Sequence, residues 1–238
     1  VYILVVIVVV AGGGGPRGGF GEVLPGKAGP PGLLSAGGRD TNPAGMEFDN
    51  RKLKPPFKWI RNTDYAANFD DFLAQVKKGQ PFCFWLGTSE PHRAYERGAG
   101  KRTGKDEANV IVPGIFPDNF IVRNDILDYF VEVEHFDKMV VRAIDSLEKL
   151  GQLDNTIVVV TSDHGMPFPR AKASLYDAGT HVPLAIRWPK GIRKSGRVSQ
   201  ALVNLSDLGP TFLQAAGISV PKMMTGKGLA DIFKDKTK

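Results

Sequence analysis

Asp163 and His164 are the adjacent side chains in this sequence that are best suited to hold a metal ion. They lie in the tetrapeptide Ser162-Asp163-His164-Gly165, directly after the apolar, β-branched run of residues 155–161. A carboxylate oxygen and an imidazole nitrogen can share a divalent cation, and Gly165 lets the backbone turn close beside it. The tetrapeptide alone is equally typical of a strand that ends in an Asx turn. The surrounding sequence therefore has to decide between the two.

His92, Arg93 and Lys172 could handle an anion. His92 and Arg93 follow a second apolar run, residues 81–87, and Lys172 lies nine residues after Asp163. Histidine titrates near neutral pH and suits proton transfer, and lysine can stabilise developing negative charge. Taken alone, such a histidine is more often a surface residue, and a loop lysine is usually only solvated.

These residues need elements that bring them together. The continuous apolar run of residues 155–161 predicts a parallel strand covered on both faces, and residues 81–87 predict another strand. Between them, residues 124–150 predict a long helix capped by Asn124 or Asp125. A right-handed strand, helix, strand crossover places the carboxyl ends of both strands at one sheet edge, where ligands bind in α/β folds.

The long helix is expected to bury an apolar stripe and to turn its polar residues to water. The expected stripe comprises Ile126, Phe130, Val133, Phe136, Val140, Ile144 and Leu147. The residues expected to face water are Asp128, Glu132, Lys138, Arg142 and Glu148. We expect His135 and His181 to be packing or hydrogen-bonding residues.

Further elements extend the pattern. We predict a helix that begins at Thr63 or Asp64 and ends near Val76, a strand at residues 183–188, a strand at 200–205 and a helix at 206–216. Residues 95–120 are rich in Gly, Lys and Arg and are long enough to be a substrate-facing excursion.

The amino-terminal part differs from the rest. Residues 1–10 are wholly apolar but too few to span a bilayer as a helix; they fit a signal-peptide core or a buried strand equally well. Residues 12–45 are rich in Gly and Pro and predict loop or linker. We therefore divide the chain into residues 1–45, an apolar start followed by a loop-like segment, and residues 46–238, a partial α/β catalytic domain.

Composition limits the function classes. With 42% hydrophobic and 24% charged residues the chain can form a core, and its net charge of +6 favours anionic partners. The basic residues are scattered and follow no nucleic-acid-binding pattern, so we expect no nucleic-acid partner. The single cysteine excludes an internal disulfide.

Several motifs together resemble one family. The segment from Asn155 to Tyr176, with the following His181-Val182-Pro183-Leu184, resembles the carboxyl half of the type I sulfatase catalytic domain, heparan N-sulfatase (sulfamidase) branch. Glu90-Pro91-His92-Arg93 resembles the Pro-His-Arg motif of that branch, residues 123–129 its long helix, and residues 206–212 its Asp-Leu-x-Pro-Thr segment. The resemblance covers residues 36–217. It implies an alkaline phosphatase-like sandwich with a mainly parallel sheet flanked by helices, incomplete at the amino terminus.

The resemblance also implies roles for individual residues. Asp163 matches a carboxylate that ligates calcium, and His164 matches a position that is Asn or His in the family; we assign both to a Ca²⁺ site, with sulfate contact as the alternative for His164. His92 matches the histidine that contacts sulfate and protonates the leaving group, and Lys172 matches the basic residue that contacts sulfate. We expect Arg93 to support its loop or to bind substrate.

Two parts of the family site have no assigned residue. Sulfatases attack sulfur with a formylglycine made from Cys or Ser in Cys/Ser-x-Pro/Ala-x-Arg, and the only cysteine, Cys83, lies inside an apolar strand. The amino-terminal Asp pair of the metal site also has no counterpart, and two ligands would hold Ca²⁺ weakly. We therefore expect a fragment that is inactive by itself, with the formylglycine in a missing amino-terminal part.

Three functions remain open from the sequence. The first is a metal-dependent hydrolase of sulfate esters or N-sulfated sugars. The second is a phosphodiesterase or phosphonate hydrolase of the same superfamily, and the third is a non-catalytic remnant that binds sulfated glycans. The expected partner is a sulfated carbohydrate or another sulfate ester. By family, the location is periplasmic, secreted or lysosomal.

Overall fold

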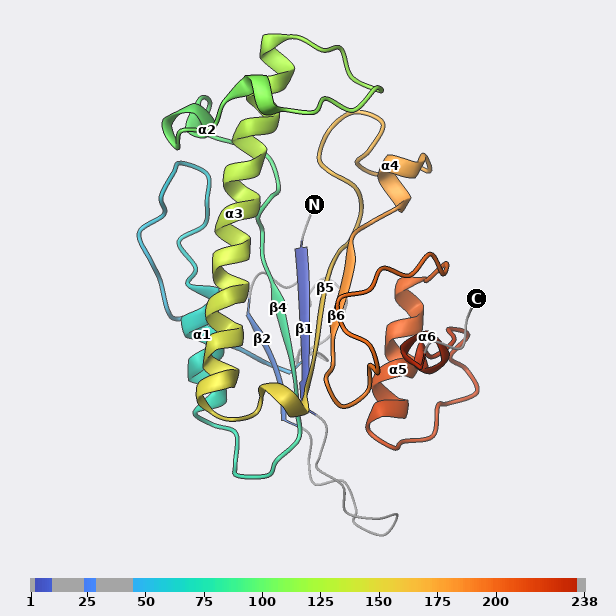
Figure 1. The fold of residues 1–238 in the computed structure, drawn as a ribbon. Helices are drawn as coiled ribbons and strands as arrows, with labels where there is room; N and C mark the ends of the chain where they lie inside the picture. The colour runs from blue at the N-terminus through green and yellow to red at the C-terminus, as the bar shows by residue number, and fades with distance from the viewer. Residues whose placement is uncertain (1–2, 10–23, 29–44, 235–238) are drawn as a thin grey trace, which may run out of the picture.

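The computed structural model describes residues 3–9, 24–28 and 45–234, which form a six-stranded sheet with helices on both faces (Figure 1). The strand order is β3-β2-β4-β1-β5-β6. The strands are β1 Ile3–Val9, β2 Leu24–Ala28, β3 Met46–Glu47, β4 Phe82–Gly87, β5 Thr156–Ser162 and β6 Leu184–Arg187. The helices are α1 Tyr65–Leu73, α2 Ala99–Arg102, α3 Phe120–Lys149, α4 Asp177–Thr180, α5 Leu208–Ala215 and α6 Ala230–Phe233.

Four of the six strands run in one direction. β2, β3, β4 and β5 share it, and β1 and β6 run against it. The predicted α/β fold is confirmed, as is the crossover from β4 through α3 to β5. The expected mainly parallel sheet is wrong, because only two of the five strand pairings are parallel and the three that involve β1 or β6 are antiparallel. The immediate neighbours of β5 are antiparallel, because β1 lies between β4 and β5 and β6 covers the outer edge. An apolar run indicates burial on both faces and does not fix the direction of the neighbouring strand.

The described residues of the segment 1–45 form two strands. Residues 3–9 form β1 in the centre of the sheet, which is the strand interpretation of the apolar start. β2 contradicts the expected loop at residues 24–28, since it pairs with both β3 and β4 in spite of a proline and a glycine. Sheet pairing outweighs weak local strand propensity there. The remainder of the loop prediction, residues 10–23 and 29–44, lies outside the described residues.

Hydrophobic residues pack on both faces of the sheet. On one face, α1 and α3 cover β4 and β5, with Phe72 and Leu147 buried next to Phe84. On the other face, α5 and α6 pack Leu208 and Phe233 against β5. Side chains of a strand alternate between faces, and consecutive residues of β5 accordingly belong to different cores: Val158 to the first, and Ile157 and Val159 to the second. The predicted burial of β5 on both faces is confirmed.

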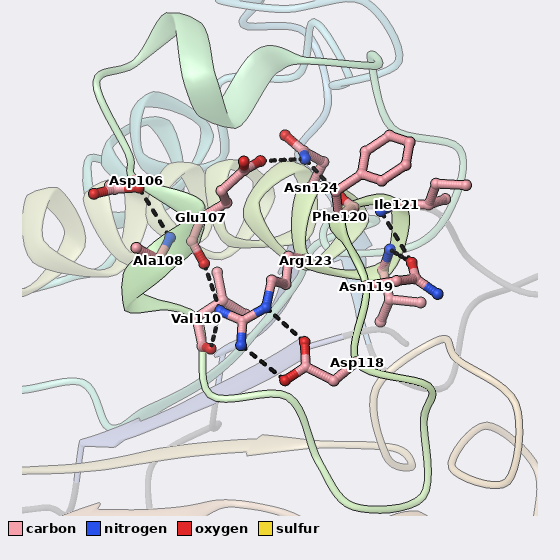
Figure 2. Close-up of polar contacts among 11 residues, drawn as sticks. Asp106, Glu107, Ala108, Val110, Asp118, Asn119, Phe120, Ile121, Arg123 and Asn124 are labelled. Carbon is pink, nitrogen blue, oxygen red and sulfur yellow. Dashed lines mark hydrogen bonds and ion pairs between the residues drawn. The ribbon is translucent and has the colours of Figure 1, made fainter.

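The helix caps agree with the prediction for α1 and differ for α3. Asp64 caps α1 by accepting a hydrogen bond from the backbone N–H of Ala67 at 3.0 Å. α3 begins earlier than predicted, because Asn119 accepts hydrogen bonds from the N–H groups of Ile121 and Val122 (Figure 2). Its first two residues, Phe120 and Ile121, are exposed, so no apolar stripe marks this first turn in the sequence.

The buried face of α3 is more polar than predicted. Asp128 and Glu132 were expected to face water but are only 4% and 3% exposed, whereas Phe130 is exposed. The reason is that α2 packs on this face: Asp128 accepts hydrogen bonds from the N–H groups of Gly98 and Gly100 at 2.9 and 2.8 Å. Helical periodicity cannot show that another segment will present buried N–H groups to a carboxylate.

The carboxyl-terminal part differs in one element. Residues 200–204 have no regular structure, which contradicts the predicted strand, and the side chain of Leu202 is fully exposed. A capping box of Asn204 and Asp207 then starts a 3₁₀ turn that leads into α5. β6 agrees with the predicted strand at residues 183–188.

The described residues contain no helix with the length and apolar character that a bilayer crossing requires.

Candidate functional site

The predicted site residues follow the carboxyl ends of β4 and β5, which are level with each other. In the sheet register, Leu4 of β1 lies opposite Gly87 of β4 and opposite Thr161 of β5. The loops that carry His92 and Asp163 therefore leave the sheet at the same edge, the upper one in Figure 1. This placement confirms the geometric prediction from the crossover.

His92 and Lys172 are in direct contact. Lys172 Nζ lies 3.0 Å from His92 Nε2, and His92 Nδ1 lies 2.5 Å from the carbonyl oxygen of Arg93. A carbonyl oxygen only accepts, so Nδ1 carries the hydrogen and Nε2 offers its lone pair to the lysine ammonium group. The contact therefore selects one neutral tautomer of His92 and directs the cation of Lys172 to the nitrogen that would face an anion.

A tight turn around Phe168 holds Lys172 in place. The N–H groups of Ala171 and Lys172 both donate to the carbonyl oxygen of Phe168, at 3.2 and 3.1 Å. The Phe168 ring is buried and makes an edge contact with Tyr129 of α3, with ring centroids 5.9 Å apart. Arg170 has a φ of 62°, in the left-handed region that costs energy for a residue with a Cβ atom. Packing on α3 thus fixes a strained turn that presents Lys172.

Asp163 and His164 present two electron-pair donors side by side. His164 Nδ1 lies 2.8 Å from the carbonyl oxygen of Gly165 and therefore carries the hydrogen, while Nε2 lies 3.6 Å from Asp163 Oδ2. The Ser162 hydroxyl donates to the carbonyl oxygen of His164 at 3.0 Å and fixes that backbone. A carboxylate oxygen and an unprotonated imidazole nitrogen at this distance can share a proton or contribute to a cation site.

Gly165 is required by close packing. A Cβ atom at this position would lie 1.8 Å from the carbonyl oxygen of Ala178. The backbone N–H of Gly165 donates to the carbonyl oxygen of Gly179 at 3.1 Å. The glycine predicted to allow a close turn does so because α4 packs directly on it.

The described residues do not form a complete calcium site. Within residues 3–9, 24–28 and 45–234, no group of three or more His, Cys, Asp and Glu side chains is arranged to hold a metal ion. Asp163 and His164 contribute one carboxylate and one imidazole, whereas Ca²⁺ takes 6–8 oxygen ligands. The donor set of this part of the chain therefore fits only a fraction of the coordination that the ion needs.

Arg93 connects three segments. Its Nε donates to the carbonyl oxygen of Pro167 at 2.8 Å, and its two Nη atoms bind the two carboxylate oxygens of Asp125, Nη1 at 2.9 Å. The guanidinium group also lies 4.8 Å from the Tyr95 ring centroid and 4.6 Å from that of Phe168. The Asp125 carboxylate raises the pKa of Arg93. Of its two predicted roles, these contacts describe support of the loop.

A buried acidic cluster lies behind His92 and was not predicted. Glu90 is 1% exposed and accepts hydrogen bonds from the Arg61 N–H at 2.8 Å and from the Tyr65 hydroxyl at 3.0 Å. Burial, together with the charge of Glu90, raises the pKa of Glu132 to about 8. Burial lowers the pKa of His135. A glutamate between an apolar strand and a Pro-His pair is the signal that could have identified this cluster.

The other two assigned histidines differ in environment. His135 is buried in α3, as expected of a packing residue, but its Nε2 has no hydrogen-bond partner among the described residues. His181 is highly exposed and lies 3.5 Å from the carboxylate of Asp177, so it pairs on the surface and does not pack.

Neither Cys83 nor Ser89 has the surroundings of an activated nucleophile. Cys83 lies in β4, and burial raises the pKa of its thiol, which disfavours the reactive thiolate. Ser89 begins a Ser-x-Pro-x-Arg spacing, residues 89–93, that the sequence-based assignment leaves out. Its hydroxyl is buried and has no hydrogen-bond partner among the described residues, so it meets neither a base nor substrate.

Comparison with known proteins gives a consistent family. The family model described as Sulfatase matches residues 39–218. The human protein named N-sulphoglucosamine sulphohydrolase is 30% identical over 168 residues, covering 62% of this chain and 34% of the relative. Arylsulfatase K of Bos taurus is 38% identical over 221 residues, covering 75% of this chain and 40% of the relative. The chain thus spans well under half the length of these relatives.

A solved structure supports the fold. A protein of Bacteroides thetaiotaomicron, from a locus for the metabolism of multiple glycosaminoglycans, aligns with a TM-score of 0.63 at 22% identity, covering 82% of this chain and 45% of that chain. Since the family match extends over the site, from before His92 to beyond Lys172, the chain belongs to the sulfatase family.

Proposed function

We propose that this chain takes part in the hydrolysis of sulfate esters or N-sulfated sugars, and that it supplies the part of the site that binds the sulfate group and protonates the leaving group. The observation that carries the proposal is the 3.0 Å contact between Lys172 Nζ and His92 Nε2. The two residues lie on the loops that follow β4 and β5, and they bring their polar atoms together. Asp163 and His164 belong to the second of these loops.

The chemistry follows from the state of His92. When the imidazole takes up a proton at Nε2, it becomes a cation next to the ammonium group of Lys172, and the two groups repel each other. A sulfate whose oxygens accept hydrogen bonds from both groups relieves that repulsion. Nε2–H is then placed to give its proton to the oxygen or nitrogen of the leaving group as the bond to sulfur breaks. The Nδ1–H bond to the Arg93 carbonyl oxygen keeps the ring oriented throughout.

Asp163 and His164 would contribute two ligands to a divalent cation, Ca²⁺ by analogy with the family. Such a cation would neutralise charge on the sulfate oxygens. The remaining ligands, and the formylglycine that attacks sulfur in this family, have no assigned residue among those described.

The substrate class is proposed from the relatives and the charge. One relative is named for N-sulphoglucosamine, and a net charge of +6 favours an anionic sugar. We therefore propose N-sulfated or O-sulfated amino sugars as substrates.

Titration with inorganic sulfate tests the proposal. We expect sulfate to perturb the imidazole NMR signals of His92, and we expect His92→Gln and Lys172→Met each to weaken sulfate binding about tenfold or more. Lys77→Met is the matched control, because this exposed lysine precedes β4 and lies at the opposite edge of the sheet. Unchanged affinity in Lys172→Met would refute the proposal. Tighter binding of phenylphosphonate than of sulfate would favour the phosphonate hydrolase alternative.

A further inference from the structure

The first turns of α3 bind the loops that surround the site. Arg123 donates to the carbonyl oxygens of Glu107 and Val110 at 2.8 and 3.1 Å and pairs with Asp118 (Figure 2). Two residues further on, Asp125 binds the guanidinium group of Arg93. The beginning of this helix is therefore a fixed frame to which separate loops are attached.

Arg93 is attached to this frame by geometry that only an arginine provides. Its three nitrogens are all engaged, two by the carboxylate of Asp125 and Nε by the carbonyl oxygen of Pro167. The flat face of the group packs against the rings of Tyr95 and Phe168. A planar, bidentate, stacked guanidinium group cannot be replaced by the point charge of lysine.

Both members of the sulfate-binding pair, His92 and Lys172, are linked to Arg93 through the backbone. The carbonyl oxygen of Arg93 accepts the Nδ1–H of His92. On the other side, Pro167 precedes Phe168, whose carbonyl oxygen holds the N–H of Lys172. A displacement of Arg93 would therefore change the orientation of His92 and the position of the Lys172 turn together.

We infer that Asp125 is a positioning residue that acts through Arg93 to hold His92 and Lys172 at the separation that sulfate requires. The inference rests on the proposed function of that pair. Asp125 binds the guanidinium group of Arg93, so its effect on the site passes through that group and the two backbone segments that the group holds.

The alternative role of Arg93, direct contact with substrate, predicts the opposite sign. If Arg93 binds sulfate, then Asp125 competes for the same guanidinium group, and its neutralisation would strengthen sulfate binding. If Arg93 instead holds the loops in place, neutralisation of Asp125 loosens the contact between His92 and Lys172 and weakens sulfate binding. One nearly isosteric substitution, Asp125→Asn, therefore separates the two roles.

The experiment compares Asp125→Asn with Asp118→Asn in the full chain. Asp118 forms a comparable ion pair with Arg123 near the start of the same helix (Figure 2). Arg123 in turn binds the carbonyl oxygens of Glu107 and Val110, whereas Arg93 binds that of Pro167. Sulfate affinity, the ¹⁵N shifts of the His92 imidazole and the thermal unfolding midpoint are measured for each. We expect Asp125→Asn to lose the single Nδ1–H tautomer and to bind sulfate about tenfold more weakly. We expect Asp118→Asn to keep both properties, with a similar unfolding midpoint.

Arg93→Lys is the second variant, in case Asp125→Asn does not fold. It keeps the charge but not the planar fork, and we expect the same loss of tautomer and affinity. If the wild type binds no sulfate, the proposed function fails. The tautomer of His92 in the variants then still shows whether Asp125 and Arg93 orient its imidazole ring. If the wild type binds sulfate and Asp125→Asn resembles Asp118→Asn or binds more tightly, the inference is overturned.

Discussion

Lys172 Nζ lies 3.0 Å from His92 Nε2, although the two residues are 80 positions apart in the chain. The contact joins the loop after β4 to the loop after β5, and it places a permanent cation against the one nitrogen of the imidazole that is unprotonated. While Nδ1 keeps its hydrogen on the Arg93 carbonyl oxygen, only the protonated ring can donate from Nε2. We therefore expect anion binding at this point to be coupled to the protonation of His92.

Sulfate binding is accordingly expected to take up a proton. We predict that calorimetric titrations in buffers of different ionisation enthalpy show proton uptake on sulfate binding. In His92→Gln the proton uptake should disappear, whereas the Lys77→Met control should retain it. Sulfate binding by the wild type without proton uptake would contradict the assigned tautomer.

Gly165→Ala is expected to destabilise the protein through a clash at the site. The added Cβ atom would lie 1.8 Å from the carbonyl oxygen of Ala178, and a backbone group cannot yield as the end of a side chain can. We expect a loss of about 2 kcal/mol or more in the free energy of unfolding, measured with urea. Gly114→Ala is the control, because nothing lies within 4 Å of a Cβ atom there. Equal stability of the two variants would show that α4 moves freely away from Gly165.

Glu132 is expected to make stability fall with rising pH. Burial raises the pKa of this carboxyl group to about 8, so the folded state favours its protonated form. That contribution is complete below the ordinary glutamate range and is lost as the pH rises through about 8. Between pH 7 and 9 the folded state holds up to one more proton than the unfolded state, which corresponds to a loss of about 1 kcal/mol.

The measurement for Glu132 is urea unfolding at pH 7, 8 and 9. Glu132→Gln keeps the shape without the titration, so its free energy of unfolding should stay level across this range while that of the wild type declines. Glu134→Gln is the control, since Glu134 is an exposed neighbour on the same helix. Parallel curves for wild type and Glu132→Gln would mean that the carboxylate is charged without penalty.

Much of the fold was predictable because its signals are local. The β-branched run of β5 and the helical spacing of α3 reflect burial by the main core, and they place His92 and Asp163 on one edge without knowledge of the other strands. The family resemblance assigned Lys172 to the sulfate but did not predict the Phe168 turn that carries this lysine. The close contact between Lys172 and His92, however, depends on packing against Tyr129 and was not visible in either segment.

What could not be predicted depends on partners distant in sequence. Glu132 has the helical position of a water-facing residue, and only the docking of the adjacent loops buries it. The antiparallel position of β1 between β4 and β5, and the strand β2 beside β4, depend on sheet pairing. Composition gave a strand as one of two interpretations for β1 and a loop for β2. Leu202 shows the converse, since a segment with strand-like residues forms no strand and this side chain remains exposed.

The burial of Asp128, which the sequence did not predict, has a consequence that can be measured. Its carboxylate accepts the N–H groups of Gly98 and Gly100, and the Cα of Gly100 approaches α3 so closely that a Cβ atom would lie 2.5 Å from Leu127 Cβ. Asp128→Asn replaces one acceptor oxygen by an NH₂ group, which would face one of these two N–H groups. We expect a loss of about 1–3 kcal/mol in stability, and amide hydrogen exchange at Gly98 and Gly100 should become faster. The amides of β5 serve as the internal reference, because a change confined to the α2 loop should leave their relative protection intact. Unchanged exchange at Gly98 and Gly100 would show that packing, and not the carboxylate, holds α2 on α3.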